Sequence, residues 1–206
     1  GRAVWTGSTN RTWSAFARDN ENSLLLPSPT LAQGYAREFE ALFGGQKEGL
    51  GQPVAFALEG VEGVAYFSPR GGRLAREALL KRLSEAQREV LVAAFVLTDR
   101  EVLEALLQAR RRGAEVKVLL ETRNLGTSRE EALLEEGLEV RQDANPYTMH
   151  HKVMLLDGTY VVTGSYNFSV RAHEVNNENL LVLKSPSLAE RYRKEVLRLW
   201  EAGSPL

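Results

Sequence analysis

The 206-residue chain contains no cysteine, only three histidines and no long apolar run. The missing cysteine excludes disulfide scaffolds, thiolate metal sites and cysteine nucleophiles. The longest apolar run, Val90 to Leu97, has the length of a strand and is far below the roughly 18 residues of a membrane span. No charge sign is in excess, because 26 Lys and Arg face 27 Asp and Glu, which argues against a protein that coats nucleic acid indiscriminately. All three histidines lie between positions 150 and 173, so this stretch is the first candidate for chemistry.

The sequence repeats itself at an offset of 157 residues. Of the 38 positions from Thr6 to Phe43, 17 are identical to their counterparts from Thr163 to Trp200. The identities include polar residues that a shared strand or helix does not explain, among them Asn10, Glu21 and Asn22. Such self-similarity predicts two related lobes in one chain.

The repeat also predicts how the chain is divided. Residues 1–45 are expected to be the C-terminal part of a first lobe, residues 46–60 a linker and residues 61–206 a complete second lobe. The counterparts of His150 and Lys152 would lie upstream of Gly1, so we expect one and a half copies of a two-lobed protein. Strand-like and helix-like segments alternate in the second lobe, which predicts an α/β fold with a mixed, mostly parallel sheet flanked by helices.

Four polar side chains are expected to converge in the second lobe. On a strand, His150 and Lys152 share a face because residues two apart point to the same side. The hairpin dipeptide Asp157-Gly158 returns the next strand, which brings Ser165 and Asn167 toward that face. An imidazole, an ammonium, a hydroxyl and a carboxamide together suit a phosphate oxyanion.

The pattern His150-x-Lys152-x4-Asp157-x6-Gly164-Ser165-x-Asn167 resembles the HKD signature of the phospholipase D superfamily. The stretch Gly7-Ser8-x-Asn10 resembles the tail of a second signature whose His and Lys are absent. Phe67-Ser68-Pro69 and the run from Ala105 to Leu120 also resemble the nuclease-like branch. The resemblance implies α-β-α sandwich lobes and cleavage of phosphodiesters.

The resemblance implies a role for each matching residue. His150 would form a phosphohistidine or protonate the leaving group, with Glu178 orienting its imidazole. Lys152 and Asn167 would hold the phosphoryl oxygens, assisted by Ser165. The remaining matches are the expected substrate-binding residues Ser8, Asn10 and Glu21 of the first lobe and the expected structural residues Asp157 and Gly164.

A complete site in this superfamily takes two HxK elements, and this chain holds one. The second element is expected from a missing N-terminal segment or from a second copy pairing through His150, and the chain alone is expected to be weakly active or inactive. The resemblance implies no metal and no other cofactor, since lysines and histidines supply the positive charge. Localisation stays open, because the expected upstream segment would carry any targeting signal.

Short lobes without a membrane helix favour an endonuclease-like phosphodiesterase with a nucleic-acid substrate. A phospholipid phosphodiesterase or phosphatidyltransferase is the alternative, because both chemistries attack a phosphodiester. A non-catalytic HKD binding module is a third hypothesis, and the intact set of His150, Lys152, Asn167 and Glu178 argues against it.

A metal site at His150, His151 and Asp157 is disfavoured because adjacent strand residues point to opposite faces. We expect His151 to be a solvent or interface residue and His173 a solvated loop residue near the cleft. The triple arginine at 110–112 is expected to be solvated at the C-terminal end of a helix, where cations are favoured, rather than to bind phosphates.

Aromatic residues flank the motif. Tyr147, Tyr166 and Phe168 are candidates to stack on bases or to line an acyl groove. Core packing is the alternative for Tyr166.

Overall fold

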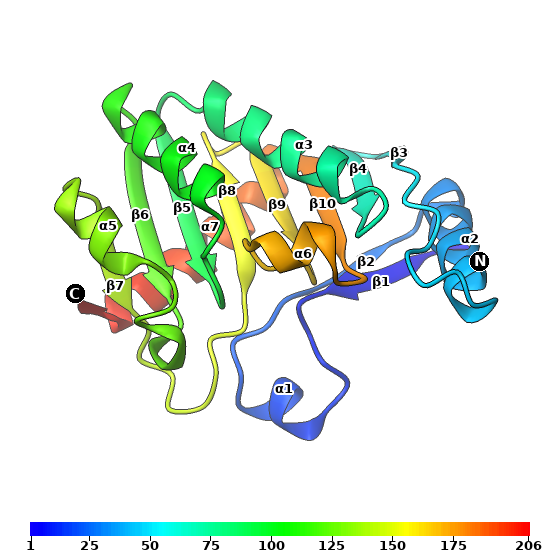
Figure 1. The fold of residues 1–206 in the computed structure, drawn as a ribbon, viewed down its shortest axis with the longest axis horizontal. Coiled ribbons are helices and arrows are strands. Elements are labelled where there is room, and N and C mark those ends of the chain that lie inside the picture. Colours follow the sequence, from blue (N-terminus) through cyan, green and yellow to red (C-terminus); the bar gives the residue numbers. More distant parts are fainter.

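The structure is a computed structural model that describes residues 1–206, and its main body is a nine-stranded sheet (Figure 1). The strand order is β11-β7-β6-β5-β8-β9-β10-β4-β3. The strands are β3 (Val54–Leu58), β4 (Val61–Phe67), β5 (Glu89–Ala94), β6 (Glu115–Leu120), β7 (Glu139–Gln142), β8 (Lys152–Leu156), β9 (Tyr160–Gly164), β10 (Asn179–Lys184) and β11 (Ser204–Pro205). The prediction of an α/β fold with a mixed sheet flanked by helices is confirmed.

Parallel pairing is confined to β5–β6 and β6–β7, so it is rarer than expected. The other neighbouring strands are antiparallel. The reason is local: helical crossovers connect β5, β6 and β7, whereas tight hairpins reverse the chain between β3 and β4 and between β8 and β9.

Helices cover both faces of the sheet (Figure 1). One face packs against α3 (Gly72–Glu85), α4 (Arg100–Arg111), α5 (Glu130–Glu135) and α6 (Val170–Glu174), and the other against α2 (Pro29–Phe43) and α7 (Pro186–Ala202). Each face has its own apolar core, of 26 and 21 buried residues respectively. A 3-10 turn spans Thr122–Asn124. None of the helices combines the length and the apolar character that crossing a bilayer requires.

A small second sheet carries the first-lobe sequence. It consists of β1 (Val4–Gly7) and β2 (Ser23–Leu26), which are antiparallel and are joined by a loop that contains α1 (Trp13–Ala17). In Figure 1 this loop projects from the body below the middle of the main sheet, next to the loop that leads into β8. The order β1-β2-α2 repeats the order β9-β10-α7 at the offset of 157 residues.

Reciprocal hydrogen bonds join the two copies of the repeat. The Oδ1 atom of Asn179 accepts from Thr6 Oγ1 at 2.9 Å and from Tyr35 OH at 3.1 Å. The Oδ1 atom of Asn22 accepts from the equivalent hydroxyls, those of Thr163 and Tyr192, each at 2.9 Å. The copies therefore contact one another through equivalent side chains, as a pseudo-two-fold arrangement requires.

The expected linker contains an unpredicted strand. β3 lies within residues 46–60 and forms the edge of the main sheet, paired with β4. Its Val54 and Phe56 alternate with exposed residues, the period-2 pattern of an edge strand. The preceding stretch is fastened by the buried Glu38, whose Oε2 accepts from the backbone N–H groups of Leu50 and Gly51.

Asp157 occupies the predicted hairpin turn between β8 and β9, with φ of 54° at Asp157 and 63° at Gly158. Its carboxylate accepts hydrogen bonds from the backbone N–H groups of Gln87, Arg88 and Glu89. Burial raises the pKa of Asp157, but these bonds outweigh it and leave the pKa below the usual value. The side chain thus ties the turn to the start of β5.

We therefore expect Asp157→Ala to lower the free energy of unfolding by about 1–2 kcal/mol, because three backbone donors lose their acceptor. Urea denaturation monitored by circular dichroism measures the change. The Asp157→Asn control keeps one acceptor oxygen and should lose less. Because the native pKa is depressed, the wild-type advantage should shrink as the pH falls below about 4. Equal stability of wild type and Asp157→Ala at pH 7 would contradict this role.

Candidate active site

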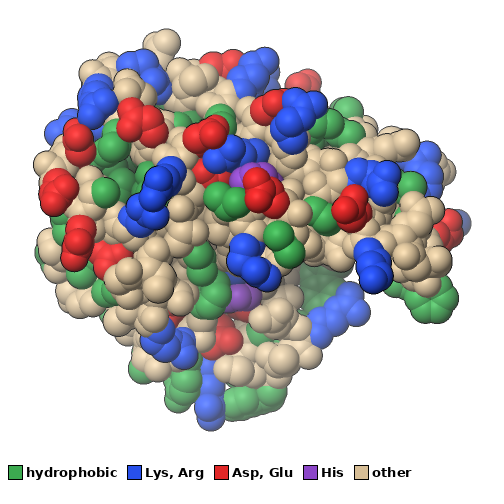
Figure 2. All heavy atoms as spheres, viewed as in Figure 1, with side chains coloured by type: hydrophobic (Ala, Val, Ile, Leu, Met, Phe, Trp, Pro, Cys, Tyr) green, Lys and Arg blue, Asp and Glu red, His purple; other side chains and the backbone are tan.

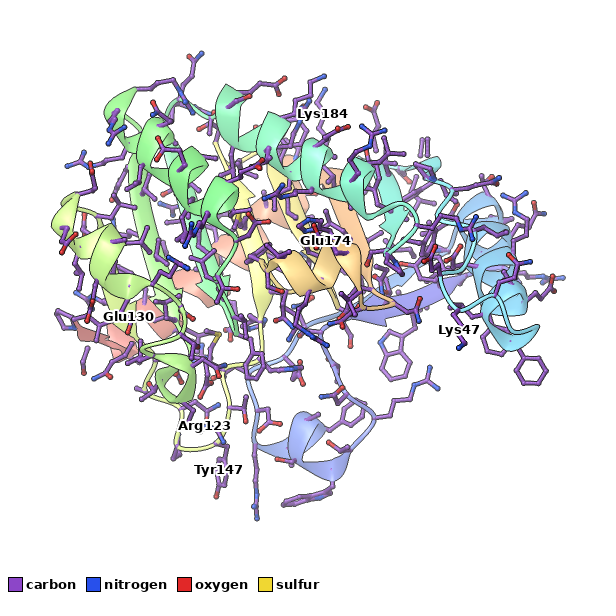
Figure 3. The ribbon with its side chains drawn as sticks, viewed as in Figure 1. Lys47, Arg123, Glu130, Tyr147, Glu174 and Lys184 are labelled. Carbon is purple, nitrogen blue, oxygen red and sulfur yellow. The ribbon has the colours of Figure 1, made fainter.

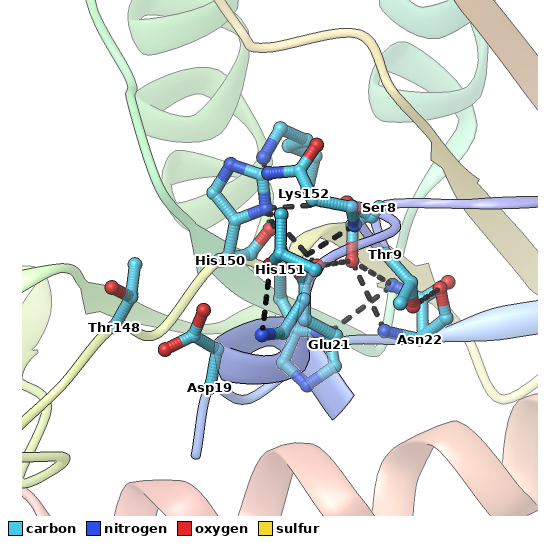
Figure 4. Close-up of polar contacts among 12 residues, drawn as sticks. Ser8, Thr9, Asp19, Glu21, Asn22, Thr148, His150, His151 and Lys152 are labelled. Atoms are coloured by element: carbon cyan, nitrogen blue, oxygen red, sulfur yellow. Dashed lines mark hydrogen bonds and ion pairs between the residues drawn. The ribbon is translucent and has the colours of Figure 1, made fainter. Parts of the chain in front are cut away.

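His150 and Glu21 form the centre of the site, although they come from different copies of the repeat (Figure 4). His150 lies two residues before β8, and its Nδ1 atom lies 3.0 Å from each carboxylate oxygen of Glu21. The backbone oxygen of Ser8 is 3.2 Å from the same nitrogen. Two kinds of acceptor at Nδ1 place the ring proton there. The Nε2 lone pair is then free to act as a nucleophile.

The expectation that Glu178 orients His150 is wrong. Glu178 and Glu21 are equivalent in the repeat, and the structure brings Glu21 to the imidazole instead. Glu178 accepts a hydrogen bond from Asn176 Nδ2 at 3.3 Å. The physical reason is that the two copies face one another, so Glu21 points across the contact between them to the imidazole of the second copy.

Ser8 and Asn22 hold Glu21 in place. Ser8 Oγ donates to Glu21 Oε2 at 2.6 Å and accepts from the backbone N and the Nδ2 of Asn22. Gly7 permits the close approach: its φ is 150°, and a Cβ there would lie 2.1 Å from Asn22 O. Gly164 has the same role in the second copy, with φ of 139° and 2.2 Å to Asn179 O.

Lys152 lies next to the imidazole and is buried, with 3% of its surface exposed. Its Nζ donates to the backbone oxygen of His150 at 2.9 Å and lies 4.7 Å from the centre of the Phe95 ring. Burial lowers the pKa of Lys152 to about 8, while the nearby carboxylates of Glu21 and Glu178 act in the opposite direction. The lysine is thus a desolvated cation, and an anion bound beside it would interact strongly with it.

The other predicted site residues lie around this centre without hydrogen bonds to His150 or Lys152. Ser165 Oγ accepts from the backbone N and Nδ2 of Asn179, as Ser8 does from Asn22. The Oδ1 atom of Asn167 is buried and has no hydrogen-bond partner. Asn10 is exposed, and its backbone N lies 3.4 Å from Glu21 Oε1. These groups leave capacity for a ligand.

Of the two alternatives for His151, solvent or interface, the structure favours the interface, whereas His173 differs from expectation. His151 is 2% exposed and its Nδ1 is 3.1 Å from Asn22 Nδ2, so it lies at the contact between the copies. His173 lies on the short helix α6 and is buried, with Nδ1 3.7 Å from a carboxylate oxygen of Asp99. Both residues are enclosed by segments distant in sequence, which the local pattern does not reveal.

Sequence reasoning missed Phe95 and Asn22. The Phe95 ring packs edge-on against the His150 ring, with 4.6 Å between the ring centres, and it also faces Lys152. Phe95 belongs to the apolar run that predicts a buried strand, so its sequence context gives no sign of a site. Asn22 carries a signal, because it is one of the polar identities of the repeat.

The side of the molecule seen in Figure 2 shows no concentration of one charge. Lys, Arg, Asp and Glu side chains are interspersed over it, and histidine surface is visible near its middle (Figure 2). The positive charge of the site is therefore local to it. No group of three or more His, Asp or Glu side chains is arranged to hold a metal ion.

Residues 79–200, more than half of the chain, match the family described as "Cardiolipin synthase, PLD-like domain". The chain belongs to this phospholipase D family. A mitochondrial cardiolipin hydrolase of Xenopus laevis is 36% identical over 129 residues, which are 62% of this chain and 61% of the relative. A phospholipase D of Rickettsia typhi is 33% identical over 128 residues, 61% of this chain and 62% of the relative. The chain thus spans less than two thirds of the length of these relatives.

Solved structures share the fold. Nuc of Salmonella typhimurium, a phospholipase D family member, is 30% identical with a TM-score of 0.66, over 71% of this chain and 98% of Nuc. The phosphatidylserine synthase of Haemophilus influenzae covers this whole chain and 61% of its own, with a TM-score of 0.72. Its identity is 13%, so this second likeness concerns the fold alone.

Replacing each of the two equivalent glutamates by glutamine separates their roles. We expect Glu21→Gln to lower kcat for a phosphodiester about 10²- to 10⁴-fold, because the imidazole loses the carboxylate that orients it. Glu178→Gln, the matched control, should leave the ring nitrogen signals of His150 in a 15N-histidine NMR spectrum unchanged. Altered His150 signals in Glu178→Gln, with unaltered signals in Glu21→Gln, would restore the original assignment.

The lowered pKa of Lys152 predicts a pH effect. Below about pH 8 the ammonium carries its charge, and above it the charge is lost, so kcat/KM should fall on the alkaline side from about pH 8. In Lys152→Arg the charge persists to pH 10, so this alkaline fall should be missing even if the rate is lower throughout. A profile that stays flat to pH 10 in the wild type would contradict the prediction.

Proposed function

We propose that the protein is a phosphodiesterase in which His150 is the nucleophile. The observation that carries this proposal is the contact of Nδ1 with Glu21, because it directs the basic Nε2 away from the carboxylate. Nε2 attacks phosphorus, the bond from phosphorus to the leaving oxygen breaks, and that oxygen takes a proton from an acid. Water then attacks the phosphohistidine, gives up a proton and releases free Nε2.

The neighbouring groups suit the charge that develops on the phosphoryl oxygens. Lys152 contributes a desolvated ammonium, and Asn167 contributes an amide whose Nδ2 can donate to a phosphoryl oxygen. Ser165 and Asn10 add polar groups at the rim. In this proposal the chain needs no metal or other cofactor to bind the phosphate.

A second HxK element would complete the site. The pseudo-two-fold arrangement sets Glu178 opposite the place where a second histidine would lie, as Glu21 is set opposite His150. The first copy also exposes apolar side chains that its counterpart buries: Trp5 and Phe43 are 48% and 85% exposed, whereas their repeat counterparts Val162 and Trp200 are buried. Polypeptide outside residues 1–206, or a second copy of the chain, would cover this surface and supply the acid that protonates the leaving oxygen.

The preferred substrate is a nucleic acid, because two aromatic rings and an arginine stack on one another beside the site. This group of Trp13, Arg18 and Tyr147 is called the rim stack. The Arg18 guanidinium lies 4.5 Å from the Trp13 ring centre and 4.7 Å from that of Tyr147. Tyr147 lies at the edge of the molecule beside the loop that carries α1 (Figure 3). The stack is tied to the site, because Asn20 of the same loop accepts from the backbone N–H of His150. Aromatic rings and arginines at such a rim suit unpaired bases.

A phospholipid is the second candidate substrate. The matching family is described as a cardiolipin synthase domain, and curated relatives are named cardiolipin hydrolase and phospholipase D. Those names belong to the relatives, whose chains are longer than the matched region. The phosphodiester that His150 would attack is common to both substrates.

Hydrolysis of bis(p-nitrophenyl) phosphate in excess EDTA tests the proposed reaction. We expect at most weak turnover by the chain alone and none by His150→Ala, whose folding is checked by circular dichroism. If polypeptide outside residues 1–206 completes the site, a version that includes it should be more active; if a second copy does, the activity per molecule should rise with protein concentration. Turnover retained in His150→Ala would refute the nucleophile, and a strict need for a divalent ion would refute the metal-free reaction. Silence of both the chain and the longer version, with both folded, would favour a binding module.

The substrate preference is tested at the rim stack. We expect Trp13→Ala and Tyr147→Ala to raise KM for a single-stranded oligonucleotide about 5- to 30-fold, because a stacking partner is lost. KM for bis(p-nitrophenyl) phosphate should not change, since it is too small to reach the rim. Faster cleavage of anionic phospholipid vesicles than of oligonucleotides would instead support the lipid substrate.

A further inference from the structure

His151 approaches the catalytic unit from the far side of β8. The side chains of His150 and His151 point to opposite faces, as adjacent residues of an extended segment do. The His151 ring nevertheless contacts Asn22, which lies between the faces at the contact of the two repeat copies (Figure 4). The mechanism proposed above makes no use of this buried imidazole.

The orientation of the Asn22 amide is determined by its four partners. Its Oδ1 accepts from the hydroxyls of Thr163 and Tyr192. Its Nδ2 therefore has two hydrogens for Ser8 Oγ at 3.2 Å and His151 Nδ1 at 3.1 Å. A donor aimed at Nδ1 requires a lone pair there, so the His151 proton resides on Nε2.

We propose that His151 is a positioning residue: as a neutral acceptor it fixes Asn22, and through Ser8 and Glu21 it fixes the ring of His150. The path consists of short hydrogen bonds from His151 to Asn22, from Asn22 to Ser8, from Ser8 to Glu21 and from Glu21 to His150. The importance of this path for turnover rests on the proposed function, whereas its effect on the His150 ring does not.

The surroundings of His151 keep it neutral. Burial lowers its pKa to about 4, while the carboxylates of Glu195 and Glu21 act in the opposite direction and the neighbouring Lys152 and His150 add to the lowering. Its Nε2 has no hydrogen-bond partner, and the nearest carboxylate oxygen, on Glu195, is 4.0 Å away. Glu195 is itself held by Arg198 at 2.8 Å. His151 is therefore neutral near pH 7, and its Nδ1 can accept the hydrogen bond from Asn22.

The second copy of the repeat provides an internal comparison. Asn179 is the counterpart of Asn22 and accepts from two equivalent hydroxyls through Oδ1, those of Thr6 and Tyr35. Its Nδ2 donates to Ser165 Oγ at 3.3 Å, as that of Asn22 donates to Ser8 Oγ. The repeat thus reproduces the Asn–Ser part of the path, and the position equivalent to His151 lies outside residues 1–206.

Three variants test the proposal. His151→Asn keeps an acceptor oxygen at about the position of Nδ1, and His151→Phe keeps a ring but no acceptor. Val153→Ala is the matched control, because Val153 is fully buried on the same face of β8 and takes no part in the path. The full chain, labelled with 15N-histidine, is compared by NMR of the ring nitrogens, and kcat and KM are measured on bis(p-nitrophenyl) phosphate.

In the wild type and in His151→Asn we expect His150 to show a single tautomer with its proton on Nδ1. In His151→Phe the Nδ2 donor of Asn22 is left unsatisfied. We therefore expect the imidazole of His150 to exchange between tautomers, and kcat to fall about 10- to 100-fold with KM little changed. Val153→Ala should lower Tm without altering either readout.

Wild-type His150 signals in a folded His151→Phe would overturn the proposal. So would His150 signals disturbed as much in Val153→Ala as in His151→Phe, since that would show a packing effect. Absence of turnover in the wild type would count against the proposed function alone, and the ring signals would still decide the role of His151.

Discussion

The hydrogen bond between His150 Nδ1 and Glu21 joins residues 129 positions apart, and the site depends on it. It fixes which ring nitrogen carries the proton, and it places a carboxylate next to a desolvated lysine. It also brings two copies of one sequence motif face to face. The first copy contributes Val4, Leu26 and Leu31 to one of the two apolar cores, and the contact between Glu21 and His150 exists only where this copy lies against the main sheet.

The contact between the first copy of the repeat and the main sheet is polar around Glu21 and His150. β1 and β2 do not extend the nine-stranded sheet, so they are held by side chains such as Thr6, Asn22 and Asn179 and by a backbone bridge between Asn20 and Met149. Such buried polar contacts are specific in orientation, because each donor has one acceptor at the correct distance. A purely apolar contact would tolerate rotations that misplace Glu21.

Local pattern predicted the alternation of strands and helices in the second lobe and the hairpin turn at Asp157-Gly158, because these depend on neighbouring residues. It missed β3, whose two buried residues lie in a stretch rich in glycine that suggested a linker. The spacing of the motif predicted His150 and Lys152 as candidate catalytic residues. The partner of His150 was not, since Glu21 and Glu178 are equivalent in the repeat and only the arrangement of the copies distinguishes them. The burial of His151 likewise follows from the arrival of Asn22.

The division of the site between two copies also links its geometry to a contact between distant segments. Glu21 reaches His150 Nδ1 only where the first copy lies against the main sheet. A substitution that loosens this contact, even one far from His150, would therefore leave the imidazole free to rotate and let its tautomers interconvert. The orientation of one ring is in this way a property of the whole fold and not of the strand that carries it.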